Sequence, residues 1–134
     1  MCATYYARTS DHGYETCAEH LAMAGCLAGG FAKGFGYLDD GLLAGLVHDL
    51  GKYSDAFQRR IRNPDHCGPV DHSTAGALLL MRHVCPLAAM AVAGHHAGLP
   101  DLGSYGELEG STFMSRMNRA RRAGDCNPLA LAQV

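Results

Sequence analysis

Residues 46–52, Leu-Val-His-Asp-Leu-Gly-Lys, place an imidazole and a carboxylate side by side at the end of an apolar run. Leucines upstream of the pair recur at helical spacing, so the run predicts a buried helix whose last turn carries His48 and Asp49. A carboxylate is rarely buried unless it is paired with a cation or binds a metal. Gly51 is expected to end the helix in a left-handed conformation, with Lys52 just beyond it. The stretch therefore predicts a metal site at a helix end, with a chance His-Asp pair as the alternative.

The composition indicates one globular domain. The chain has 134 residues, of which 48% are hydrophobic and 18% charged, and eight of them are histidines, a high count for this length. A net charge of −2 excludes an overall basic field of the kind that attracts nucleic acid. Six cysteines form no Cys-x-x-Cys pair, and no apolar run reaches the ~20 residues that span a bilayer. The first residues lack a basic segment followed by a hydrophobic run, so no secretory signal is expected. A reduced, cytoplasmic setting without a membrane partner is expected.

The first long helix is predicted to start at Thr16, which forms a capping box with Glu19. One apolar face follows at helical spacing and is expected to face the core. This face comprises Cys17, His20, Leu21, Ala24, Leu27, Ala28 and Phe31. His20 therefore points inward, where a core histidine and a metal ligand both fit the pattern.

Two more helices are predicted in the middle of the chain. Asp39 and Asp40 are expected to cap the helix that ends in the His-Asp pair. Ser54 or Asp55 starts a short helix that reaches residue 62. Residues 1–13 carry no periodic pattern and are predicted to be an irregular lead-in.

The second half of the chain predicts three helices. Asp71 is expected to cap one of them, with His72 and Ser73 in its first turn. A helix led by Pro86 follows, and residues 113–122 form an amphipathic helix with several arginines. Since no alternating strand pattern occurs, the predicted fold class is all-α.

Five histidines and one aspartate stand at the ends or inner faces of separate predicted helices. They are His20, His48, Asp49, His72, His95 and His96. Their spacing matches no zinc-finger pattern, whereas a helical bundle builds a metal site from ligands on several helices. A carboxylate between two sets of imidazoles suits a dinuclear centre of divalent Mn, Fe, Co or Ni, and suits Mg less well because Mg prefers oxygen ligands. Lys52 can add a positive charge for a phosphoryl group.

Together the motifs resemble the HD superfamily of metal-dependent phosphohydrolases, which are helical bundles, and more narrowly the HD nuclease of type I CRISPR systems. The quoted motifs are His48-Asp-x-Gly-Lys52, Asp71-His-Ser-x-Ala-Gly76 and Gly94-His-His-x-Gly-Leu-Pro-Asp101, with His20 upstream. The last two motifs are the ones that distinguish this family from chance matches, because a bare His-Asp pair is common. The match covers roughly residues 5–105.

The resemblance implies metal ligands in two sets. The first set is His20, His48 and Asp49, and the second is Asp49, His72, His95 and His96. Asp49 is then the bridge between two metal ions. The resemblance also implies that Lys52 and Ser73 lie close to the scissile phosphate and belong with Asp49 to the catalytic residues.

The implied reaction is the hydrolysis of phosphodiester bonds in single-stranded DNA. In the family this nuclease accompanies or is fused to the CRISPR helicase subunit, and it acts on the strand displaced by the RNA-guided surveillance complex. The family also supplies a further aspartate to the first metal from a downstream helix, and the closing residues of this chain do not resemble that helix. Residues 1–134 are therefore interpreted as the N-terminal part of a single HD-type nuclease domain.

Two other functions stay open on the sequence. An HD phosphohydrolase acting on nucleotides or cyclic dinucleotides shares the His-Asp core but does not need the His-His-x-Gly-Leu-Pro-Asp loop. A truncated, non-catalytic module would keep a metal for structure, or for docking to the helicase subunit.

Overall fold

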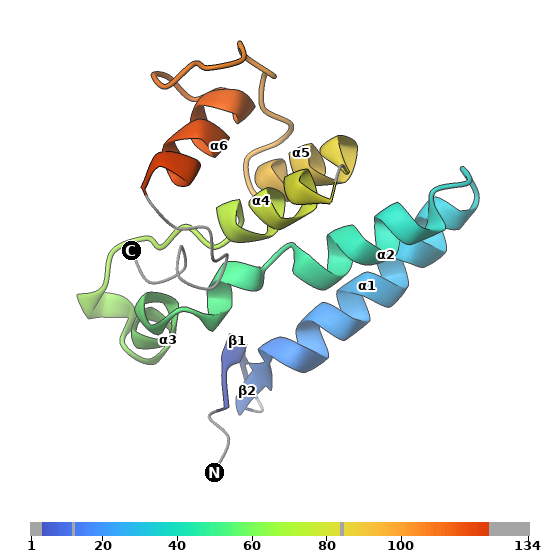
Figure 1. The fold of residues 1–134 in the computed structure, drawn as a ribbon. Coiled ribbons are helices and arrows are strands. Elements are labelled where there is room, and N and C mark those ends of the chain that lie inside the picture. The colour runs from blue at the N-terminus through green and yellow to red at the C-terminus, as the bar shows by residue number, and fades with distance from the viewer. Residues whose placement is uncertain (1–3, 12, 84, 124–134) are drawn as a thin grey trace.

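A computed structural model describes residues 4–11, 13–83 and 85–123 of the chain, and these residues are mainly helical (Figure 1). The strands are β1 (Tyr6–Ser10) and β2 (Gly13–Thr16), and the helices are α1 (Cys17–Lys33), α2 (Leu38–Val47), α3 (Asp55–Arg62), α4 (Thr74–Arg82), α5 (Pro86–Gly94) and α6 (Phe113–Arg122). Two short 3-10 helices are η1 (Leu50–Tyr53) and η2 (Pro64–His66). No helix among the described residues combines the length and apolar character needed to cross a bilayer.

The N-terminal hairpin corrects the prediction of a purely helical chain with an irregular lead-in. β1 and β2 pair antiparallel, with Ser10 opposite Gly13 at the tight end. A two-stranded hairpin is marginal in water on its own, so it needs support from the rest of the fold. Gln58 of α3 supplies that support, because its amide accepts from the Tyr6 N–H (3.1 Å) and donates to the Tyr6 carbonyl (2.8 Å). This contact spans more than fifty residues of sequence, which is why no local pattern reveals it.

The α1 and α2 helices pack side by side in opposite directions (Figure 1). The predicted capping box is confirmed: Thr16 Oγ1 accepts from the Glu19 N–H, and the Glu19 carboxylate accepts from the Thr16 N–H. The predicted aspartate cap of α2 is wrong, because that helix follows Tyr37 without a side-chain cap. Asp39 and Asp40 instead lie in its first turn, where carboxylates still favour the positive end of the helix dipole.

The apolar face of α1 is only partly covered by the described residues. Cys17 and Leu21 are buried as predicted, whereas Leu27 and Phe31 are 56% and 77% exposed. The prediction that the whole face lies in the core is therefore wrong for its C-terminal half. The reason is geometric: α1 extends past α3 to α6, and of the described elements α2 alone runs alongside its far end (Figure 1).

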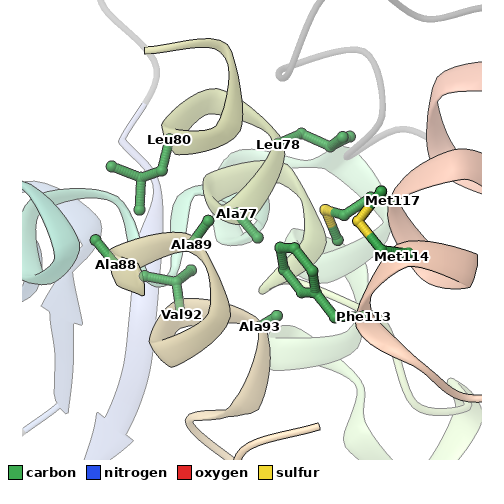
Figure 2. Packing of buried hydrophobic residues seen from close by; sticks show 10 residues of the cluster. All are labelled: Ala77, Leu78, Leu80, Ala88, Ala89, Val92, Ala93, Phe113, Met114 and Met117. Atoms are coloured by element: carbon green, nitrogen blue, oxygen red, sulfur yellow. The ribbon is translucent and has the colours of Figure 1, made fainter. Parts of the chain in front are cut away.

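The main core lies where α4, α5 and α6 meet (Figure 2). Phe113 and Met117 project from α6 toward the small residues Ala77 of α4 and Ala93 of α5 (Figure 2). Small side chains on the facing helices leave room for the aromatic ring and the thioether, which are both fully buried. The predicted bounds of this last helix, 113–122, are confirmed.

The starts of α3 and α4 are close to their predicted places. Ser54 caps α3 by accepting the Phe57 N–H at 3.1 Å. Asp71 accepts the N–H groups of Ser73 (3.0 Å) and Thr74 (3.2 Å) and so supports the start of α4. The predicted Asp71 cap is nevertheless wrong, because Ser73 is the N-cap residue and the helix has no side-chain cap. The helix itself begins at Thr74, however, so His72 and Ser73 precede it and do not form its first turn.

Two glycines allow the segment after α2 to lie against the start of α4. A Cβ on Gly51 would come 2.5 Å from the Cα of His72, and a Cβ on Gly76 would come 2.0 Å from the Val47 carbonyl oxygen. The Gly51 N–H also donates to the His72 carbonyl at 3.0 Å. The left-handed cap predicted at Gly51 is wrong, because α2 ends at Val47 and Gly51 lies within η1 without a positive φ. Gly51 is needed here because it has no side chain, which lets its backbone lie against that of His72.

Gly76→Ala is expected to lower the free energy of unfolding by about 1–3 kcal/mol, since the methyl group must push the Val47 backbone away. Gly30→Ala is the matched control: Gly30 lies inside α1 with no atom within 4 Å of the added Cβ. There the change is expected to add about 0.5–1 kcal/mol through helix propensity. Urea unfolding followed by circular dichroism measures the free energy of unfolding of both variants. Equal values for Gly76→Ala and Gly30→Ala would contradict the close contact between Gly76 and Val47.

Candidate metal centre

A single buried carboxylate stands at the centre of the predicted ligand cluster. Asp49 is 2% exposed and follows the last turn of α2. Its Oδ2 lies 3.0 Å from His20 Nε2 and 3.1 Å from His48 Nε2. Its Oδ1 lies 3.1 Å from His95 Nε2 and 3.4 Å from His72 Nε2. The two oxygens of Asp49 thus face two different sets of imidazoles.

His96 completes the cluster beside His72, with 2.7 Å between the two Nε2 atoms. The structure therefore brings together all six residues that the sequence singled out. They form two groups that share Asp49, one with His20 and His48 and the other with His72, His95 and His96. Within each group the ligand atoms lie within 4.8 Å of one another, so each group can hold a metal ion.

Three imidazoles are oriented by backbone carbonyls of their own segments, to which Nδ1 donates. The pairs are His48 with Gly45 (2.8 Å), His72 with Val70 (3.0 Å) and His95 with Val92 (2.7 Å). A carbonyl can only accept, so Nδ1 carries the proton and the Nε2 of a neutral ring presents a lone pair. Metal-binding histidines are held by this kind of outer hydrogen bond.

The donor set fits a divalent cation. Lone pairs on the Nε2 atoms point at the anionic oxygens of Asp49, an arrangement that is repulsive unless a proton or a metal lies between them. Imidazole and carboxylate together suit first-row transition metals better than Mg²⁺. The arrangement of the described residues therefore supports a site for a metal of this series.

Lys52 is a direct neighbour of the buried carboxylate. Its side chain is nearly buried, its Nζ lies 2.6 Å from Asp49 Oδ2, and the ammonium stands 5.5 Å from the centre of the Phe57 ring. In this arrangement Lys52 neutralises the buried carboxylate. Its predicted contact with a phosphate stays a prediction.

The ionisation of the cluster follows from burial and from these contacts. Burial disfavours the Asp49 anion, but protons shared with His48 and His95 and the hydrogen bond from Lys52 outweigh it and hold the pKa of Asp49 well below its usual range. Burial lowers the pKa of His72 and of His96. For His48 burial acts in the same direction, but the hydrogen bond and charge of Asp49 outweigh it and raise the pKa.

Sequence reasoning missed Glu15 of β2. Its Oε2 is buried, pairs with the Arg8 guanidinium and lies 3.4 Å from His20 Nδ1. A carboxylate at this nitrogen favours the tautomer that presents Nε2 to Asp49. No helical spacing relates Glu15 to His20, because Glu15 belongs to the hairpin that was not predicted.

The other predicted site residues have these places. Ser73 is buried beside His72, and its hydroxyl accepts from Arg116 Nη2 at 2.6 Å, so its predicted contact with the scissile phosphate stays a prediction. Asp101 belongs to neither ligand group, and its carbonyl accepts the Phe113 N–H. Asp125 lies outside the described residues.

No model of a known protein family matches this chain, and no curated protein matches it. The interpretation as an HD nuclease therefore depends on the motifs and on the geometry of the cluster. The fold and site by themselves define a mainly helical domain with an Asp/His cluster able to hold metal.

With the shared Asp49 included, the His72–His95–His96 group offers four protein ligands and the His20–His48 group offers three. We therefore expect the four-ligand group to bind its metal ion more tightly. His95→Ala should weaken metal binding by at least ~10–100-fold, the loss typical of even an outer-shell partner. His20→Ala, the matched histidine change, should leave the tighter ion in place. Calorimetric titration with Mn²⁺ measures both, and equal tight binding of two ions by the unmodified chain would contradict this order.

The two groups should also release metal at different pH. A proton competes with the metal for each Nε2. The raised pKa of His48 means that it takes up a proton at higher pH, whereas the lowered pKa values of His72 and His96 keep their lone pairs free to lower pH. On acidification from about pH 8 to about pH 5, the His95→Ala chain should therefore lose Co²⁺ before the His20→Ala chain. Absorption of bound Co²⁺ measures the pH at which each variant has lost half of its metal. Loss from the His20→Ala chain at the higher pH would contradict the prediction.

Proposed function

We propose that this protein is a metal-dependent phosphohydrolase that cleaves phosphodiester bonds in single-stranded DNA with two divalent cations. One observation carries the proposal: the two oxygens of the buried Asp49 carboxylate face separate sets of imidazoles. A shared carboxylate of this kind holds two cations close together, as two-metal hydrolases require.

When bound, such a pair of cations would activate a water molecule and neutralise charge on a phosphoryl group. The chain's own residues would hold and orient that pair. Asp49 supplies one oxygen to each side, and the carbonyl-anchored rings of His48, His72 and His95 present their Nε2 atoms in fixed directions. Little rearrangement is then needed at the moment of reaction.

Lys52 has a role that changes with the charge of the site. Its ammonium neutralises Asp49 in the structure described above. With cations sharing the Asp49 charge, the Lys52 ammonium would be able to donate to a phosphoryl oxygen, and the neighbouring Phe57 ring would keep it near the site. This is the role that the motif resemblance implies for Lys52.

Part of the cluster is open to solvent, as a site for a phosphodiester substrate requires. The side chains of His20 and His95 are each 21% exposed, and His96 is exposed. The choice of single-stranded DNA, and of the CRISPR helicase subunit and surveillance complex as partners, comes from the resemblance of the motifs to type I CRISPR HD nucleases.

A second candidate function is a non-catalytic module that holds metal and docks to the helicase subunit. The exposed apolar side chains of Leu27 and Phe31 on α1 favour a protein partner on that face. Metal content and nuclease activity, measured on the same preparation, separate this function from the enzyme.

The proposal predicts that the chain cleaves a short single-stranded DNA in the presence of Mn²⁺, Co²⁺ or Ni²⁺, and that a chelator stops it. Asp49→Ala should lower the rate by more than about 100-fold, since the change removes a ligand from both sets. Asp65→Ala is the matched control because Asp65 is exposed in η2, outside both groups. Cleavage of labelled DNA on a denaturing gel measures these rates.

Undiminished cleavage by Asp49→Ala protein would contradict the proposal and point to a contaminating nuclease. A panel of nucleotides and cyclic dinucleotides assayed in parallel tests the substrate class. Turnover of that panel without cleavage of DNA would favour the nucleotide phosphohydrolase. Bound metal without turnover of any of these substrates would favour the docking module.

A further inference from the structure

The Arg116 guanidinium, on α6, holds two ligand-bearing segments together. Nε donates to Thr74 Oγ1 (2.6 Å), and Nη1 donates to the Ala93 carbonyl (2.8 Å). Nη2 lies against both Asp71 oxygens (2.9 and 3.2 Å) and the Ser73 hydroxyl (2.6 Å). One side chain thus joins the start of α4 to the last turn of α5.

These contacts flank the metal ligands without including any of them. Asp71 and Ser73 are the two neighbours of His72 in the sequence, and Ala93 lies two residues before His95. Arg116 belongs to neither ligand group. Its contacts therefore control how the segment of His72 sits relative to the segment that carries His95 and His96.

Asp71 and Arg116 each lie at a helix end whose dipole favours their charge. The negative Asp71 lies at the N-terminus of α4, where unpaired N–H groups and the positive end of the helix dipole favour an anion. The positive Arg116 lies at the C-terminus of α5, where a carbonyl of the last turn lacks a partner within the helix. A planar guanidinium with five donors can serve all of these acceptors at once, whereas a lysine ammonium offers three donors on a flexible stem.

The other face of α6 explains how Arg116 is kept in place. Phe113 and Met117 pack into the core formed with α4 and α5, so the helix that carries Arg116 is anchored on both sides of it (Figure 2). The side chain thus leaves a fixed backbone and ends in a fixed set of acceptors. This rigidity is what a supporting residue of a metal site needs.

We propose that Arg116 is a positioning residue of the metal centre, which sets the geometry of the His72, His95 and His96 ligands by bonding the start of α4 to the end of α5. The inference rests on the metal centre of the proposed function. It assigns a role to α6 that none of the sequence motifs includes.

The test is a Co²⁺ titration of the full chain in a His20→Ala background, so that the binding measured belongs to the group of Asp49, His72, His95 and His96. Arg116→Met removes the donors and keeps an unbranched apolar stem, and Arg116→Lys keeps the charge. Arg119→Met is the matched control: Arg119 lies on the same helix but donates to the carbonyls of Leu108 and Gly110. Co²⁺ affinity, the visible spectrum of bound Co²⁺ and the unfolding temperature without metal are recorded for each.

Arg116→Met is expected to weaken Co²⁺ binding by about 10–100-fold, the effect typical of losing outer-shell support, and to change the spectrum of the bound ion. Arg116→Lys should recover part of the affinity, and Arg119→Met should bind like the parent. If Arg116→Met does not fold, Arg116→Lys carries the test, and parent-like affinity in that variant would overturn the inference. Parent-like affinity and spectrum in folded Arg116→Met would overturn it too. If the unmodified chain binds no Co²⁺, the metal centre of the proposed function fails as well, so the two failures are distinguishable.

Discussion

The structure depends on one electrostatic constraint, the burial of the Asp49 carboxylate. A charge removed from water must be met by cations or by donors, because its desolvation is otherwise too costly for a small domain to bear. Asp49 is met by Lys52 from its own segment and by imidazoles that come from α1, from the segment before α4 and from the turn after α5. Four parts of the chain are thereby required to converge on one group.

Close convergence needs small residues where the segments cross. Gly51 and Gly76 permit the backbone after α2 to touch the start of α4, and the alanines of α4 and α5 permit the packing of Phe113 and Met117. Gly51 and Gly76 belong to the same sequence motifs as the ligands His48, Asp49 and His72. The motifs therefore encode the packing of the site as well as its chemistry.

The surface formed by α1 and α2 is more apolar than the surroundings of Arg116. A groove of about 250 Å³ lies between α1, α2 and α5, is lined largely by alanines and reaches His48 and His95. Beyond it, Leu27 and Phe31 stay exposed among the described residues. The Asp/His cluster thus borders an apolar surface, whereas its other border is made of the polar contacts of Arg116, Asp71 and Ser73.

The sequence by itself determined the features that depend on neighbours a few residues apart. The Thr16–Glu19 capping box, the Ser54 cap and the bounds of α6 were all predicted, because their hydrogen bonds and periodicity lie within one or a few helical turns. The six residues of the Asp/His cluster could also be named, because all of them stand at ends or inner faces of helices that the periodicity predicts.

Only the tertiary structure decided how those parts meet. His20 and Asp49 are 29 residues apart, and His95 and Asp49 are 46 apart, so which oxygen each imidazole faces depends on how the helices pack. The hairpin needed Gln58, and Glu15 and Arg116 acquired their contacts through that same packing. Periodicity reports which face of a helix is apolar, but not what covers it, which is why Leu27 and Phe31 were predicted to be buried and are exposed.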